Sequence, residues 1–420
     1  MSESASAASP LPTHHLSSMR GRDPHEHHRA ATPLELLFDL TFVIAFGLAA
    51  SQLAHLLAEG HTMAGLTGFG FAMFAVCWAW INFSWFASAF DTDDWIYRLT
   101  TMVQMVGVLI LALGLPQMFA SIDAGGHVDN AIMVLGYVVM RSAMLFQWLR
   151  AARQYPDGRA ACMTYATTIL IAQIGWVLLI FIDMSLFTTA ASAAVLVLIE
   201  MTGPVIAERR KGGTPWHAHH IAERYGLLAI ITLGEGVVGT VASISAIVDA
   251  QGWNLDAILI CIAGTGLTFG MWWLYFLLPS GQVLHQFRNR SFLWGYGHII
   301  VFSAIAATGA GLHVAAYYIE HKAHIGAAAT VLTVAIPVFI YVLMIFLHYV
   351  HLLQKMEAFY LMLMGGTAVL VVLPVLLAAG GVSMTLCLVI LMLAPLVPIA
   401  GYEMKGHRYG SEALKRVLGA

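Results

Sequence analysis

Two carboxylic acids stand inside long apolar stretches of this sequence. Asp39 is followed by the uninterrupted run LTFVIAFGLAA. Counted from His220 at about 1.5 Å per residue, Glu235 lies roughly 20 Å into a helix, with Gly234 and Gly236 beside it. An ionised acid in bilayer hydrocarbon costs about 2.5 to 3.5 kcal/mol, so each should face the bundle interior or water. We expect both to line a polar path for a small ion or solute. For each, a buried carboxyl held by an interhelical hydrogen bond is the structural alternative.

Two further acids lie at expected helix entrances. The stretch TPLE at 32–35 predicts a capping box, in which the side chains of Thr32 and Glu35 satisfy free backbone N–H groups. Glu223 would meet the positive end of a helix dipole. Asp39 lies one turn beyond Glu35 on the same face, past the reach of a cap. We give Glu35 a structural role. The dipole contact is a structural interpretation of Glu223 too, but we keep Glu223 as a candidate for the path.

Arg141 and Glu200 also fall inside apolar stretches, about two turns or more from the nearest polar end. An unpaired arginine is costly there, so we expect Arg141 to pair with Asp39, Glu200 or Glu235. The sequence does not choose among them. We place Arg141 and Glu200 on the path, with Arg141 as its counter-charge. Arg224 is close enough to a helix end to extend back to the interface.

The stretch WINFSWFASAFDTDDWIYRL at 80–99 combines an amide inside the membrane with a charged turn after it. We assign Asn82 to the path. Asp91, Asp93, Asp94 and Arg98 form an acidic cytoplasmic turn, for which two interpretations remain. Asp91 or Asp94 caps the next helix, or the turn attracts cations to the mouth of a path.

The histidines give a weaker signal. His298 and His313 share one apolar stretch and could relay protons, although core packing is an equal alternative. The histidines in polar segments show no metalloprotease spacing, and we predict no metal site and no other cofactor from them. They are His25, His27, His28, His217, His219 and His220.

Composition explains why these polar residues are informative. The chain has 420 residues, of which 59% are hydrophobic and 10% charged, whereas soluble domains carry about 25% charged residues. We therefore predict an all-α, polytopic membrane protein whose partner is the lipid bilayer, with a small ion or solute as its other ligand. No feature indicates nucleic-acid binding, and the sequence does not indicate an oligomeric state. The cysteines all lie in apolar stretches and indicate no disulfide or zinc framework.

Apolar windows predict about twelve transmembrane helices. They lie near 34–58, 64–90, 99–120, 129–149, 160–182, 187–207, 220–247, 255–278, 293–316, 326–350, 358–378 and 383–402.

Lysine and arginine set the expected orientation. With the N-terminus inside, the inner connections are rich in these residues, and Lys322 alone lies outside. Both termini should thus be cytoplasmic. The expected segments are a disordered cytoplasmic tail (1–31), a first six-helix half (32–207), a cytoplasmic linker (208–219), a second six-helix half (220–404) and a second cytoplasmic tail (405–420).

A weak sequence similarity between the two halves suggests that they are parallel repeats. ATPLELLFDL opens the first half and GTPWHAHHIAERYGLL the second, each with Thr-Pro followed by a glutamate, and WAWINF is echoed by MWWLYF. Parallel repeats occur in several transporter folds, while chance similarity between apolar helices is the alternative.

Several stretches together resemble the low temperature requirement A (LtrA) family of bacterial membrane proteins. They are TPLELLFDLTFVIAF with SQLAHLL, the DTDD stretch with Arg98, HHIAERYGLLAIITLGEG, MWWLYF and WGYGHIIVFSAIAATGAGL, and they cover most of residues 32–320. The resemblance implies a helical bundle of the bacterial inner membrane, linked by family name to growth in the cold, without an agreed activity. Leu277 stands where many relatives carry an acid. The family pattern falls on Glu35, Asp39, His55, Asn82, Asp94, Arg98, Glu223, Arg224 and Glu235.

Three functions are compatible with these features. A transporter or channel for a small ion or solute explains acids at different depths with glycine beside them. A non-transporting sensor or assembly protein linked to low-temperature growth is the alternative. A membrane-embedded enzyme fits less well, because the sequence offers no catalytic triad or HExxH motif, and we predict no catalytic residues. Transport is the favoured hypothesis.

Overall fold

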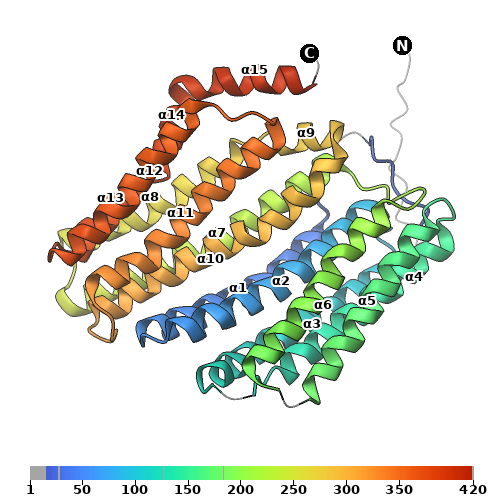
Figure 1. Cartoon of the computed structure of the whole chain (residues 1–420), viewed down its shortest axis with the longest axis horizontal. Helices are drawn as coiled ribbons and strands as arrows, with labels where there is room; N and C mark the ends of the chain where they lie inside the picture. The colour runs from blue at the N-terminus through green and yellow to red at the C-terminus, as the bar shows by residue number, and fades with distance from the viewer. Residues whose placement is uncertain (1–15, 27–28, 126, 183, 419–420) are drawn as a thin grey trace, which may run out of the picture.

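The protein is a bundle of membrane-length helices. The computed structural model describes residues 16–26, 29–125, 127–182 and 184–418, and the regular elements of these residues are all helical (Figure 1). Twelve helices in this part of the chain are long and apolar enough to cross a membrane, which confirms the predicted number. Many large apolar side chains point outward, including Leu113 at 71% exposure and Phe269 at 62%, as expected where the solvent is lipid.

The first half contributes six of these helices. They are α1 (Pro33–Ala58), α2 (Thr62–Phe90), α3 (Trp95–Asp123), α4 (Ala131–Gln154), α5 (Arg159–Ile180) and α6 (Leu186–Glu208).

The second half contains the remaining elements. They are α7 (Ala218–Gln251), α8 (Leu255–Phe276), α9 (Ser280–Gln286), the 3-10 turn η1 (Arg288–Arg290), α10 (Ser291–Ile319), α11 (Ala327–Leu353), α12 (Ala358–Ala379), α13 (Met384–Met392), α14 (Leu396–Gly401), the π-helical turn η2 (Tyr402–Gly406) and α15 (His407–Leu418).

Short polar side chains fix where several helices begin. Thr32 and Glu35 form the predicted capping box at the start of α1. Asp94 caps α3 by accepting a hydrogen bond from the backbone N–H of Tyr97, and Asn254 caps α8 in the same way. These bonds satisfy backbone donors that have no partner within their own helix.

The final membrane span differs from the single helix expected at 383–402. It is interrupted at 393–395, where α13 ends and α14 begins. Pro395 has no backbone N–H and cannot continue the hydrogen bonding of the helix, which accounts for the interruption. The chain then continues through η2 into α15, so the tail expected at 405–420 is largely helical.

The two halves meet mainly through four helices. Figure 1 shows α1 and α2 in the centre, with α3–α6 on one side and α7 and α10 on the other. Helices α1 and α2 both contact α7 and α10. Helices α1 and α7 begin at the same end of the bundle, where Glu35 lies 3.2 Å from His220. We call this end the basic end, because Arg29 and the η1 arginines also lie there.

The described part of the N-terminal tail packs against the basic end, which differs from the disorder expected for 1–31. Met19 is fully buried, and its backbone N–H donates to the Gln154 side chain at 2.7 Å. The backbone N–H of Arg22 donates to the carbonyl of Ala89 at 2.9 Å. This segment finds hydrogen-bond partners on α2 and α4, which composition does not reveal. Residues 1–15, 27 and 28 lie outside the described residues.

The two Thr-Pro motifs and their glutamates do not lie at matching positions relative to the starts of α1 and α7. Glu35 is the third residue of α1, whereas Glu223 is the sixth residue of α7, because α7 begins after its cap residue His217. The residue of α7 that matches Glu35 in position is His220. A repeat relationship between the halves stays a prediction.

Candidate functional site

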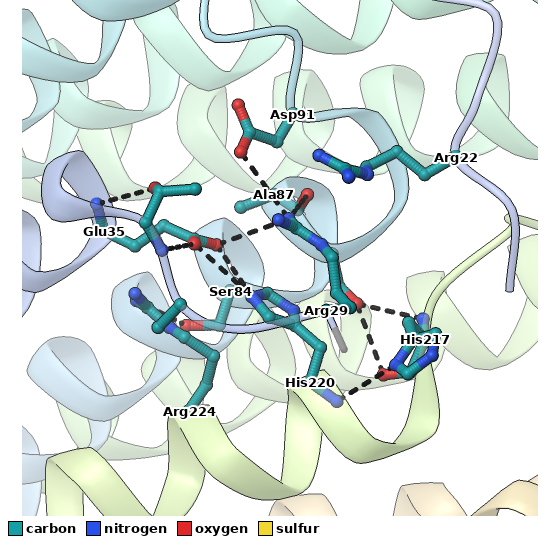
Figure 2. A network of polar contacts seen from close by, with 12 residues as sticks. Arg22, Arg29, Glu35, Ser84, Ala87, Asp91, His217, His220 and Arg224 are labelled. Atoms are coloured by element: carbon teal, nitrogen blue, oxygen red, sulfur yellow. Dashed lines mark hydrogen bonds and ion pairs between the residues drawn. The ribbon is translucent and has the colours of Figure 1, made fainter. Parts of the chain in front are cut away.

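A buried cluster of ionisable groups lies between the two halves at the basic end (Figure 2). Its members come from the N-terminal segment, α1, the turn after α2, and α7. We call it the interfacial network. It consists of Arg29, Glu35, Asp39, Asp91, His220 and Arg224, each at most 7% exposed.

Glu35 lies at the centre of this network. Its Oε2 accepts a hydrogen bond from the backbone N–H of Thr32 at 2.7 Å, and its Oε1 lies 3.2 Å from His220 Nε2 and 3.9 Å from Arg29 Nη2. Figure 2 shows His220 reaching from α7 toward Glu35, with Arg29 on the other side. The predicted cap is confirmed, and the same carboxylate also joins α1 to α7.

Asp39 forms the second link between the halves. Arg224 Nη2 donates to Asp39 Oδ1 at 2.6 Å, and the indole N–H of Trp80 donates to the same oxygen at 2.7 Å. Ser84 on α2 lies 3.4 Å from Arg224 Nη2, and the guanidinium carbon lies 5.7 Å from the centre of the Trp80 ring. Both Asp39 and Arg224 are fully buried, so Arg224 does not extend back to the interface, contrary to the expectation from sequence. A buried carboxylate holds it within the bundle instead.

The position of each residue along its helix determines which residue it pairs with across the α1–α7 interface. Asp39 is the seventh residue of α1, and Arg224 is the seventh residue of α7. Glu35 and His220 are the third residues of these helices. Because α1 and α7 begin at the same level, residues of equal rank meet across the interface as acid and base.

Arg29 brings the N-terminal segment into the network. Its Nη2 lies 3.5 Å from Asp91 Oδ2 and donates to the carbonyl of Ala87 at 3.3 Å. The pKa of Asp91 is raised to about 6: burial and then the charge of Glu35 raise it, while Arg29 acts in the opposite direction. Asp91 therefore loses its proton near pH 6 rather than near pH 4.

His217 fixes the entrance of α7 beside the network. Its Nδ1 accepts a hydrogen bond from the backbone N–H of His220, and its backbone N–H donates to Ser88 Oγ at 3.0 Å. Burial lowers the pKa of His217, which keeps the ring neutral and able to accept that bond. The ring's other nitrogen lies 2.9 Å from the carbonyl of Glu26.

The network holds unequal numbers of acidic and basic groups. Three carboxyl groups (Glu35, Asp39 and Asp91) face two guanidinium groups (Arg29 and Arg224). Among the described residues, Asp39 Oδ2 and Asp91 Oδ2 accept no hydrogen bond, and Arg224 Nε and Nη1 donate none. Buried polar atoms of this kind are suited to binding a proton, an ion or water.

Glu235 lies apart from the network. Along α7 it is eleven residues beyond Arg224, or roughly 16 Å at 1.5 Å per residue. It is 8% exposed, and none of the described residues donates a hydrogen bond to its carboxylate. Gly47 and Gly309 let α1 and α10 approach it: a Cβ added to Gly47 would lie 3.1 Å from Glu235 Oε1, and one added to Gly309 would lie 2.7 Å from its backbone.

Arg141 pairs with Glu200 and is therefore not the counter-charge of Asp39 or Glu235. Arg141 Nη2 donates to Glu200 Oε2 at 2.8 Å, and Tyr137 donates to the same oxygen at 2.6 Å. Trp176 donates to Glu200 Oε1 at 3.2 Å. These residues belong to α4, α5 and α6, so this ion pair ties the first half together and lies outside the interfacial network.

Asn82 also lies outside the network. Its side-chain amide donates to the carbonyl of Trp78, one turn back on α2, at 2.8 Å. It faces an aromatic cavity that includes Trp85 and Tyr165. The structure does not bring Asn82 to the buried acids, because its amide is bonded within its own helix.

The acidic turn is divided among different partners. Asp94 caps α3 and pairs with Arg150 of α4. Burial alone would raise the pKa of Asp94, but the hydrogen bonds from Arg150 and Tyr97 outweigh it and lower the pKa. Asp93 forms an exposed ion pair with Arg98 at 2.7 Å. The interpretation as a cap is confirmed for Asp94, and both acids are paired with arginine rather than open to a cation.

Glu223 and the two membrane histidines are dispersed. Glu223 is exposed, and its Oε1 accepts a hydrogen bond from the backbone N–H of Ala31 at 3.4 Å. His298 Nε2 lies 3.0 Å from the Tyr275 hydroxyl. His313 is fifteen residues further along α10, roughly 22 Å away, so the two histidines cannot pass a proton directly. In the described residues, no group of three or more His, Cys, Asp or Glu could hold a metal.

Sequence reasoning identifies part of the network. It singles out Asp39 and Asp91, but it gives Glu35 only a cap and Arg224 an interfacial position. Sequence reasoning places Arg29 in a disordered tail and His220 in a histidine tract to which it assigns no chemistry. The feature that could have identified Arg29 and His220 is their closeness in sequence to the starts of the two helices that carry Glu35 and Arg224.

Comparison with known proteins places these residues in a family. The model of the bacterial low temperature requirement A protein (LtrA) matches residues 30–395. An uncharacterised protein of Rhizobium meliloti (strain 1021) is 24% identical over 294 residues, which cover 66% of this chain and 67% of that protein. No solved structure matches the chain. The matched region contains the whole interfacial network except Arg29, and the chain belongs to the bacterial low temperature requirement A (LtrA) family.

Proposed function

We propose that the protein moves a small ion across the membrane, most simply a proton, and that the interfacial network is where this ion binds. The observation that carries the proposal is the charge imbalance of the network. Three carboxylates and two guanidinium groups leave one negative charge in a buried cluster, which a proton on a carboxyl group or on His220 would neutralise. The nearby Arg22 is paired with Glu26 and does not alter this balance. A buried uncompensated charge is costly, so one proton or small cation completes the network.

The location of the network supports the same function. It lies on the boundary between the two halves, which is where many transporters bind substrate and coupling ions. A proton there is exchangeable, because the pKa of Asp91 is about 6. Gain or loss of this proton changes the charge balance that holds α1 against α7.

Two acids at different depths define the direction of the path. Asp39 lies near the basic end, and Glu235 lies beside Gly47, eight residues or roughly 12 Å further along α1. Phe42 and Phe46, each 1% exposed, occupy the buried face of α1 between them. The described conformation is therefore closed between the two acids. Transfer to Glu235 requires the halves to move relative to one another, as in alternating access.

A second candidate function rests on the tightness of the Asp39–Arg224 pair. Both side chains are fully buried and are held at 2.6 Å. A pair of this kind could serve only to clamp α1 to α7 in a non-transporting sensor or assembly protein. In that case, neutralising Asp39 lowers stability and no ion flux exists to be lost.

Ion flux in reconstituted vesicles separates the two candidates. The purified protein is placed in liposomes that enclose a dye selective for protons, sodium or potassium, and the response of each dye is followed after a gradient of its ion is imposed. We expect flux with wild type and a loss of about tenfold or more with Asp39→Asn and with Glu235→Gln. Asp249→Asn is the matched control, since this acid is exposed near the end of the same helix as Glu235, and it should retain flux.

Folding must be checked in the same preparations. Each variant is compared by gel filtration and thermal unfolding before reconstitution. If well-folded wild type moves none of the three ions, the transport proposal is wrong. If Asp39→Asn is well folded and retains full flux, the interfacial network is not the binding site.

A further inference from the structure

A long groove lies along α10 and α11, away from the interfacial network. Its first part has a volume of about 710 Å³ and is walled by Leu293, Ile300 and Leu347, with the buried His348 also lining it. A second cavity of about 420 Å³ continues toward the opposite end of the bundle, between α11 and the α1–α2 pair. Ile300 lines both cavities, so they meet there.

The walls of the groove are accessible to lipid. Leu293 is 65% exposed and Leu347 is 46% exposed. Between Ile340 of the second cavity and Val350 of the first, the lining along α11 is apolar apart from His348 and extends for ten residues, or roughly 15 Å at 1.5 Å per residue. This length is close to half of a hydrocarbon core of about 30 Å, which is the thickness of one leaflet's acyl chains.

The charged and amide side chains that line the groove lie at one end only. His351, Gln354 and Lys355 line the first cavity at the basic end. Arg290 lies beside them, because its backbone carbonyl is 2.9 Å from His351 Nε2 and its Nη1 donates to the carbonyl of Leu352.

The charge at this end is positive. Lys355 pairs with Glu357, whereas the Arg290 guanidinium lies over the Phe287 ring and belongs to none of the ion pairs found among the described residues. Arg288 has other partners: it donates to the carbonyl of Trp216, and its guanidinium lies over the ring of that residue. Two cations and one acid therefore leave a net positive charge where the groove meets the membrane surface. Basic pockets between transmembrane helices are suited to anionic lipid headgroups.

We propose that this groove binds one phospholipid with an anionic headgroup, from the leaflet at the basic end. The phosphate lies against Lys355, Gln354 and Arg290. An acyl chain follows Leu293 and Leu347 toward the middle of the bundle. Charge complementarity at one end, an apolar wall of one-leaflet length and lateral exposure to the bilayer together distinguish this occupant from a soluble anion.

Lipid binding by the purified full-length protein tests the proposal. Native mass spectrometry is used to titrate phosphatidylglycerol and phosphatidylcholine onto delipidated protein in detergent. For wild type we expect phosphatidylglycerol to bind about tenfold more tightly or better. Lys355→Gln should reduce this preference about fivefold, which is the effect of removing one basic residue from a membrane surface site. Glu357→Gln should increase the preference, because it leaves Lys355 free for the phosphate.

A groove-filling variant tests the location. Leu347→Trp should weaken binding of the acyl chain and so reduce occupancy by both lipids about fivefold or more. Leu361→Trp is the matched control: Leu361 is 48% exposed on α12, similar to Leu347, and does not line this groove. It should leave binding unchanged. Leu293→Trp replaces Leu347→Trp if the latter fails to fold.

Three results would overturn the proposal. One is equal binding of the two lipids by wild type. Another is an unchanged preference in Lys355→Gln. The third is lipid occupancy that Leu347→Trp and Leu361→Trp affect equally. None of these outcomes depends on whether the protein transports ions.

Discussion

Asp91 makes the stability of this protein depend on pH in a direction opposite to that of an aspartate whose pKa is lowered by folding. Its side chain is 2% exposed, and its pKa is raised from 3.8 to about 6, mainly by burial. In the unfolded chain Asp91 loses its proton near pH 3.8, whereas the folded protein holds that proton up to about pH 6. The stabilising effect of the protonated form is therefore fully present below pH 3.8 and is lost as the pH rises through about 6.

The size of this effect follows from the two pKa values. The step from 3.8 to about 6 corresponds to roughly 3 kcal/mol, at about 1.36 kcal/mol per pH unit. Asp91→Asn removes the titrating group and keeps an oxygen that can accept the hydrogen bond from the backbone N–H of Asp93. Between pH 4 and pH 7, wild type should lose most of this roughly 3 kcal/mol relative to Asp91→Asn.

Equilibrium unfolding in detergent micelles measures the difference. The chain's 11 tryptophans provide the fluorescence signal, and unfolding free energies are compared for wild type and variant at each pH. Asp93→Asn is the control, because Asp93 lies in the same turn with its side chain 50% exposed, and its difference from wild type should show no comparable step near pH 6. A difference between wild type and Asp91→Asn that stays constant from pH 4 to pH 7 would refute the reasoning.

Two other predictions concern how the helices are joined. Asp39→Asn and Arg224→Met should each lower the unfolding free energy by about 3 to 5 kcal/mol, whereas the double variant should cost less than their sum, because neither charge is left unpaired. Strict additivity in unfolding experiments would contradict this. Gly239→Ala should destabilise by about 1 to 3 kcal/mol, since its new Cβ would lie 2.7 Å from the carbonyl oxygen of Gly309. A Cβ added to Gly234 on the same helix would have no atom within 4 Å, so Gly234→Ala should be neutral or stabilising. Equal shifts of the melting temperature for the two alanine variants would contradict this prediction.

The helical plan is predictable because lipid imposes a simple rule. Every backbone polar group in hydrocarbon must be bonded internally, so a long apolar run becomes a spanning helix. The capping box at Thr32 and the cap at Asp94 are local features and are also predictable. The break before α14 escapes this reasoning because an apolar run containing Pro395 still satisfies a hydropathy window.

The partners of the charged residues are not predictable in the same way. Arg141 needs a carboxylate as a partner, and the sequence leaves three candidates. Only the arrangement of α4 and α6 selects Glu200. Arg224 pairs with Asp39 because α1 and α7 start at one level, a relation between residues 185 positions apart. Arg29 belongs to a polar segment whose composition resembles disorder, yet its position before α1 brings it to Glu35.

The most direct test of transport through the interfacial network is the charge movement that follows a pH step. Vesicles containing the protein are adsorbed on a solid-supported membrane, and the outer solution is changed from pH 7 to pH 5. We predict a current carried by protons in wild type that is lost in Asp39→Asn and in Glu235→Gln and preserved in Asp249→Asn. A correctly folded wild-type protein that displaces no charge under this gradient would contradict proton transport by the network.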